Sequence, residues 1–205
     1  MSETVVRPPT AATTRLDGGH PALELVNTIY GQVGGPVEHD VLATPEDLVT
    51  LARRVDVAGP ATPPSATALA AARALRATLD PMLRARVGGQ PPPAEAVRAL
   101  EVAARAAYAA GRLAPCDGAL AWTWPADDPL APVHRLVHAA VGLLGDEAEL
   151  ARLHQCAGCC WLFLDHSRGA GRRWCSMADC GTEAKKRRYV ERRRERRAAS
   201  APPEG

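Results

Sequence analysis

Apolar residues recur at helical spacing along most of the first 150 positions. In residues 65–87, 94–112 and 129–144 they return every three or four positions, with polar residues between them. This period predicts three amphipathic helices, each of which buries one face. A fourth helix is expected to begin at Pro45, because Thr44 can act as its cap and an aspartate follows that threonine after three residues.

A proline and two shorter segments complete this pattern. Pro81 lies inside the 65–87 helix and should kink or restart it, since proline lacks a backbone donor. Residues 119–124 alternate behind the turn-forming sequence at 115–118, which predicts one strand of a small hairpin. Residues 19–30 fit either a short helix or an extended segment. The N-terminal domain is therefore expected to be mainly α with a small β-hairpin, an α+β class.

Composition restricts the class of protein. Hydrophobic residues make up 46% of the chain and aromatic residues only 4%, which favours a globular, helical core of small side chains. No run approaches the ~18 apolar residues of a membrane-spanning helix. The N-terminus lacks the apolar segment of a signal peptide. We therefore expect a cytoplasmic protein without a membrane partner, in which residues 1–18, rich in Pro, Thr and Ala, form a flexible arm.

Charged residues and cysteines are distributed unevenly on the two sides of residue 155. Residues 1–155 hold 13 basic and 17 acidic side chains, whereas residues 156–205 hold 12 basic and six acidic ones, with five of the six cysteines. Clustered cysteines in a cytosolic protein favour a metal site over disulfides. The expected organisation is a helical domain at 19–150, a basic, cysteine-rich module at 151–197 and a disordered tail at 198–205.

The spacing of the cysteines is typical of a structural zinc site. Cys156 and Cys159 form a CxxC pair, and after 15 intervening residues Cys175 and Cys180 form a CxxxxC pair. Four thiolates satisfy tetrahedral zinc and leave no position for a catalytic water, so one structural Zn2+ is expected. A module this small has too few large apolar residues to form a stable core, so a bound metal is expected to stabilise its fold. Reduced structural cysteines without a metal are the alternative.

We expect a treble-clef-like arrangement around this metal. Residues 161–167 and 172–175 are predicted to be two strands joined by a turn at 168–171. The second cysteine pair should then start the terminal helix, whose N-terminal dipole favours thiolate. Cys160 is a rival ligand, although its side chain should point to the opposite face of an extended segment. Cys116 is expected to be a lone thiol beside the predicted hairpin.

The terminal segment 185–197, KKRRYVERRRERR, carries nine basic and two acidic side chains. Glu–Arg pairs three and four residues apart favour a helix there, and such a basic stripe is typical of phosphate binding. DNA is the favoured partner, and RNA stays open because phosphate contacts carry no sequence information. A solvated Arg-rich tail is the alternative, and too few large apolar residues are present to favour a membrane surface. The predicted DNA contacts are Arg168, Arg172, Arg173, Lys185, Lys186, Arg187 and Arg188.

Several motifs resemble the CGNR zinc-finger family of bacteria. The resemblance is carried by CAGCCWLFLDHSR at 156–168, RRWCSM at 172–177 and CGTEAK at 180–185. LELVNT at 23–28 is similar to the opening motif of the ABATE domain that accompanies this finger. The resemblance implies a stress-related transcription regulator, with a helical, ligand-sensing N-terminal domain and a DNA-binding finger. The motif that names the family departs here at two positions, with Thr182 instead of Asn and Glu183 instead of Arg. The second change reverses a charge and would repel a nearby phosphate.

The favoured hypothesis is a zinc-dependent, DNA-binding regulator that is not an enzyme. His20, Glu24 and Asn27 are the candidate effector-binding residues of the N-terminal domain. An enzyme with its site at the same three residues is the least favoured alternative, because a short polar cluster has no defined base–nucleophile geometry. A finger that binds a partner protein, and no duplex DNA, is the main alternative. A small-molecule effector and a homodimer stay open.

Overall fold

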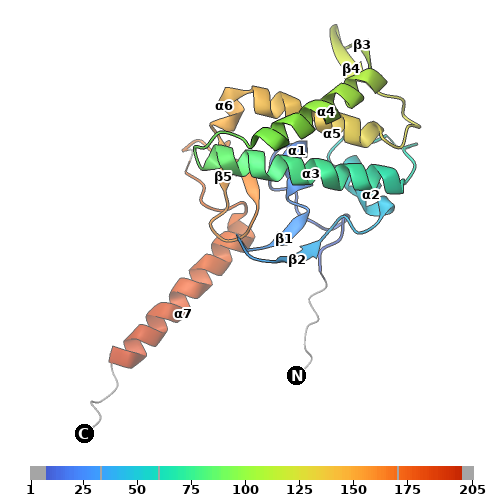
Figure 1. The fold of residues 1–205 in the computed structure, drawn as a ribbon. Helices are drawn as coiled ribbons and strands as arrows, with labels where there is room; N and C mark the ends of the chain where they lie inside the picture. Colours follow the sequence, from blue (N-terminus) through green and yellow to red (C-terminus); the bar gives the residue numbers. More distant parts are fainter. Residues whose placement is uncertain (1–7, 33, 60, 170, 200–205) are drawn as a thin grey trace.

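The computed structural model describes residues 8–32, 34–59, 61–169 and 171–199. Its body is a group of helices packed around one apolar core (Figure 1). The short helix α1 lies at the centre and contacts both α3 and α5, while α4 packs across the same two helices. The body helices are α1 (Pro21–Val26), α2 (Pro45–Arg54), α3 (Ala66–Val87), α4 (Ala94–Ala110), α5 (Ala131–Gly145) and α6 (Glu147–Leu150).

Local signals explain where these helices begin. Thr44 and Asp47 form the expected capping box at the start of α2, with each side chain accepting from the other residue's backbone N–H. Ser65 caps α3 through its own side chain alone, which accepts from the N–H of Ala68. The apolar stripes face the core, so the predicted helices are confirmed. The expected break at Pro81 is not seen, since α3 continues through this exposed residue to Val87.

Three antiparallel strand pairs accompany the helices, which gives the expected α+β class. The predicted hairpin is present, with Leu113 opposite Trp122 and a tight turn at Asp117 and Gly118, both of which have positive φ. The other two pairs were not predicted. The strands are β1 (Ile29–Gly31) with β2 (Val37–Asp40), β3 (Arg112–Cys116) with β4 (Ala119–Thr123), and β5 (Leu153–Gln155) with β6 (Leu162–Leu164).

Residues 8–18 correct the prediction of a flexible arm at 1–18. Ala11 is fully buried in the body's core, and the hydroxyls of Thr14 and Tyr30 lie 2.9 Å apart. The carbonyl of Gly18 accepts a hydrogen bond from Leu164 at 2.9 Å. The small side chains that suggested an arm instead allow the segment to pack closely against body and finger. Residues 1–7 lie outside the described part of the chain.

The C-terminal module differs from the expected layout in the position of its hairpin. The strand 162–164 pairs with 153–155, so the CxxC turn connects the two strands, and residues 172–175 form no strand. A π-helical turn (η1, Met177–Gly181) leads into α7 (Thr182–Ala199), which projects away from the body (Figure 1). The expected disordered tail at 198–205 therefore begins in helix, and residues 200–205 lie outside the described part.

Candidate metal centre and basic helix

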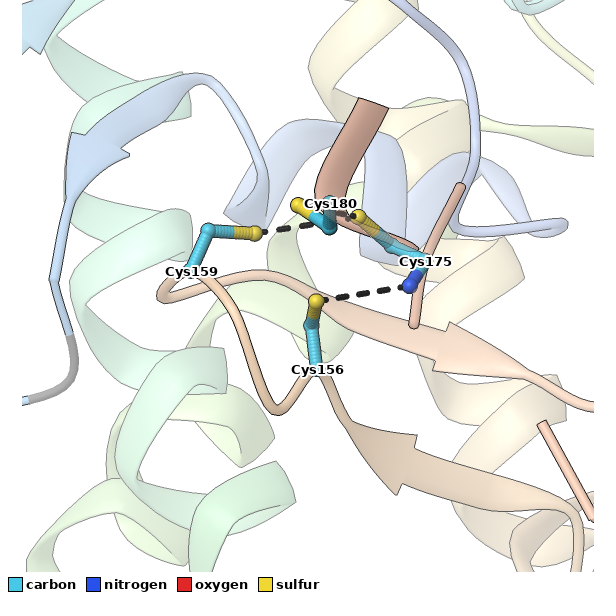
Figure 2. A group of neighbouring side chains, drawn as sticks. All are labelled: Cys156, Cys159, Cys175 and Cys180. Carbon is cyan, nitrogen blue, oxygen red and sulfur yellow. Dashed lines mark hydrogen bonds between the residues drawn. The ribbon is translucent and has the colours of Figure 1, made fainter. Parts of the chain in front are cut away.

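Four cysteine sulfurs converge between the β5–β6 turn and the start of α7 (Figure 2). All four lie within 4.8 Å of one another, and the Cys175 sulfur is 3.7 Å from those of Cys159 and Cys180. Thiolates at 2.3 Å from a tetrahedral zinc ion would be about 3.8 Å apart. The sulfurs of Cys156, Cys159, Cys175 and Cys180 therefore fit one structural zinc ion.

Short-range packing holds the two cysteine pairs together. The N–H of Cys156 donates to the carbonyl of Trp161 at 2.9 Å, which closes the CxxC turn. A Cβ on Gly158 would lie 3.1 Å from the Cβ of Cys180, so a larger residue there would press the CxxC turn away from η1. Gly158 is thus the position that allows the pairs to approach.

Backbone amides and one arginine offset the negative charge of the cluster. The N–H groups of Gly158 and Cys175 donate to the Cys156 sulfur at 3.4 Å. The thiols of Cys159 and Cys175, together with these amides, lower the pKa of Cys156. The Arg15 guanidinium lies 4.0 Å from the Cys175 sulfur and also pairs with Asp179 on η1. These donors favour the thiolate form that zinc requires.

The remaining cysteines lie outside the cluster. Cys160 points away from it, and its thiol donates to the carbonyl of Ile29 at 3.4 Å. Cys116 is exposed on β3. Sequence spacing therefore distinguished the four zinc-binding positions from the neighbouring Cys160 correctly.

The finger is fastened to the body through β6. The side-chain amide of Asn27 donates to the carbonyl of Leu162 at 2.9 Å, and its oxygen accepts from the N–H of the same residue at 3.0 Å. The Trp161 indole donates to the carbonyl of Ile29 at 2.9 Å, and Arg84 donates to the carbonyl of Cys160 at 2.8 Å. Asn27 is only 3% exposed. Because its side chain bonds to both the N–H and the carbonyl of Leu162, it takes the place of a neighbouring strand beside β6.

This role corrects the sequence-based interpretation of Asn27 as an effector ligand. His20 has a structural role as well, because its Nδ1 accepts a hydrogen bond from the N–H of Ala22 at 3.2 Å and caps α1. Glu24 is 6% exposed, and its Oε1 accepts from Gly19 at 3.0 Å. Burial raises the pKa of Glu24 to about 7. No atom of these three residues lines the cleft described next.

A cleft of about 630 Å³ lies where the body meets the finger. Its walls come from β1, the chain leading into β2, one face of α3 and Cys160 of the finger. Arg76 of α3 is already bound to Asp40 by hydrogen bonds of 2.7 and 2.8 Å, and Arg84 pairs with Asp80 at 2.9 Å. The arginines at the cleft are therefore paired with carboxylates, and apolar side chains such as Val26, Ile29 and Val37 line it as well.

The predicted DNA-contacting residues fall into different environments. Arg168 and all side chains from Lys185 to Arg188 are exposed. Arg172 is half-buried, and its guanidinium lies 4.8 Å above the Phe163 ring. The same group donates to the carbonyl of Cys175, so it stabilises the finger itself. Arg173 stacks over Trp174 at 5.5 Å. The segment between Asp165 and Arg172 forms a loop where a strand and a turn were expected. The carboxylate of Asp165 stabilises this loop, because it accepts the N–H groups of Ser167 and Arg172.

Comparison with protein families agrees with this geometry. Residues 19–147, more than half of the chain, match the family model ABATE, described as "Putative stress-induced transcription regulator". The chain belongs to the ABATE family. Residues 152–193 match the CGNR zinc finger, the region that contains the four clustered sulfurs and most of α7. No curated protein matches the chain.

This ABATE-family chain has, in its described part, no helix that combines the length and apolar character of a membrane span. Sequence reasoning missed Arg15, which lay in a segment expected to be flexible, and it missed the anchoring role of Asn27. Neither residue has a local signal, because each acts on a partner more than 100 positions away.

Proposed function

We propose that this ABATE-family protein is a zinc-dependent, DNA-binding transcription regulator and has no catalytic activity. The observation that carries the proposal is the exposed, basic surface of α7. This helix projects from the body, and every side chain from Lys185 to Arg196 is exposed. Zinc at the four cysteines would fix the start of that helix relative to the body. A positively charged helix held in this position can enter the phosphate field of a duplex.

The test is fluorescence anisotropy of a labelled random duplex across a salt series, with zinc-loaded and chelator-treated protein compared side by side. We expect steeply salt-dependent binding by the zinc-loaded form and much weaker binding after chelation. Cys116→Ser is the control variant, because this exposed thiol lies outside the cluster. Equal binding by both forms would mean that α7 acts as a polycation without the finger.

The second candidate function is a finger that binds a partner protein. It is favoured by Glu183, whose carboxylate lies 3.5 Å from the ammonium group of Lys186 and reduces the positive charge at the start of α7. Absence of duplex binding even at low salt would support this candidate and contradict the first. A matched single-stranded RNA in the same assay distinguishes RNA binding from both.

For the effector, we propose a small, largely apolar molecule bound in the cleft between body and finger. Its size falls within the range of small-molecule sites, and its walls belong to both parts, so occupancy would be linked to the position of the finger. Ala77→Trp places a large side chain on the cleft wall from an exposed position of α3. A compound that raises the melting temperature of the wild type should not raise that of this variant. An equal rise in both would place the effector elsewhere.

A cytoplasmic location and a homodimer are further parts of this proposal. Reduced zinc-binding cysteines suit the cytoplasm, and a dimer would suit a two-fold DNA site. Light scattering with and without duplex tests the dimer, for which a monomer under both conditions is the opposing result.

A further inference from the structure

The basic residues of α7 are not evenly distributed around the helix. Five of them surround Tyr189 at spacings of −4, −3, +3, +4 and +7, the spacings that place residues on one face of a helix. Tyr189 is itself 60% exposed. It lines one shallow surface depression together with Arg192, Arg193 and Arg196. We call this set the Tyr189 face: Lys185, Lys186, Tyr189, Arg192, Arg193 and Arg196.

The other side of α7 has a different character. Ala184 is buried, and it lines a second depression with Arg187, Arg188 and Glu191, next to Trp174 of the finger. Glu195 follows Glu191 by four residues and therefore lies on the same side. Both carboxylates would repel phosphates. The helix thus has one wholly basic side with an aromatic centre, and one side that meets the finger and carries the acids.

We propose that α7 lies in the major groove of duplex DNA with its Tyr189 face toward the base pairs. This inference rests on the proposed function and specifies its geometry. The major groove is about 12 Å wide and admits one α-helix. Lys185 and Arg192 lie on one side of Tyr189 and would meet one phosphate strand. Lys186 and Arg193 lie on its other side and would meet the opposite strand.

Tyr189 would then be the residue that reads sequence. Its ring can contact a thymine methyl group, and its hydroxyl can donate to or accept from base edges on the groove floor. The two glutamates would point out of the groove into solvent. An A-form RNA duplex offers no equivalent site, because its major groove is too narrow and deep for side chains to read. Charge complementarity and shape therefore both select duplex DNA.

The test compares two triple variants of the full chain, each of which removes three arginine or lysine charges from α7. The first changes the Tyr189 face by Lys185→Ala, Arg192→Ala and Arg193→Ala. The control changes Arg187→Ala, Arg188→Ala and Arg194→Ala. Alanine favours helix in both, and circular dichroism checks that helix content is retained. We expect the first variant to lower the salt slope of duplex binding by about 2.7, since each lost phosphate contact removes about 0.9.

The control should change that slope by less than 1. An equal loss in both variants would overturn the assignment of the Tyr189 face, while the proposed function would survive. Wild-type protein that binds no duplex would overturn the function itself. These two failures are therefore distinguishable within one experiment.

Substitutions of Tyr189 test its role in reading sequence. Duplexes selected by the wild type are compared with random duplexes for Tyr189→Ala and Tyr189→Phe. We expect Tyr189→Ala to reduce the ratio of selected to random affinity about tenfold, with the salt slope unchanged. An unchanged ratio, or equal binding to an RNA duplex of the same sequence, would contradict the groove assignment.

Discussion

The junction of finger and body contrasts with α7, although both belong to the same C-terminal module at 151–197. At the junction, Leu162 and Phe163 are fully buried, and the backbone of β6 is paired with β5 on one side and with Asn27 on the other. Along α7, side chains from residue 185 to 196 are exposed. The metal-binding half is therefore built into the body, while the basic half extends outward. The hairpin of the finger is thus part of the body's apolar core, and α7 begins next to this packed region through η1.

Loss of zinc should break this contrast most strongly. Structural zinc contributes about 10–16 kcal/mol to the folding of small zinc-finger peptides. Cys156 and Cys175 are the two most buried cysteines of the cluster, and Cys156→Ser removes the first of these two sulfurs. We expect loss of bound zinc and fast hydrogen exchange over residues 153–164 in this variant. Mass spectrometry measures both. The Cys116→Ser control should retain zinc and slow exchange, and protected β6 amides in a zinc-free Cys156→Ser protein would contradict the prediction.

Asn27→Ala tests the other fastening of β6. The substitution leaves the N–H and carbonyl of Leu162 buried without the partners they now have, at about 1–3 kcal/mol for each group. We expect the free energy of unfolding to fall by about 3 kcal/mol, measured by urea denaturation. Gln90→Ala, at an exposed position, serves as control and should change it by less than about 0.5 kcal/mol. A similarly small effect of Asn27→Ala would mean that its two hydrogen bonds contribute little to holding β6 against the body.

The buried Glu24 should make the body side of the junction sensitive to pH. Burial raises its pKa from 4.5 to about 7, so the folded state binds a proton more tightly than the unfolded state does. The resulting stability is fully present below about pH 4.5 and is lost as the pH rises through about 7. Between pH 5 and pH 8 the wild type should lose on the order of 3 kcal/mol relative to Glu24→Gln. Parallel pH–stability curves for the two proteins would show that Glu24 titrates normally.

The two regions also differ in how far the sequence predicts them. The long helices and α7 follow from local spacing and caps, as Thr44 illustrates, because those interactions lie within four residues along the chain. The cysteine ligands were identified from spacing and chemistry. The β5–β6 pair was not, since three-residue strands have almost no periodicity and β6 is selected by Asn27, which lies 135 positions away. The contact of Arg172 with Phe163 could not be predicted for the same reason, because it appears only after folding.

The smallest expected effect concerns the first turn of α7, where the structured junction meets the projecting helix. Glu183 forms an exposed ion pair with Lys186 at 3.5 Å, and its carboxylate also suits the positive end of the helix dipole. Glu183→Gln removes an acid three residues before a member of the Tyr189 face. The loss for the dipole is a few tenths of a kcal/mol, whereas removal of repulsion should tighten duplex binding about two- to fivefold at low salt. Glu195→Gln removes the same charge from the side that points out of the groove, and it should change affinity less. Salt-dependent anisotropy measures both, and equal gains would show that net charge alone governs binding by α7.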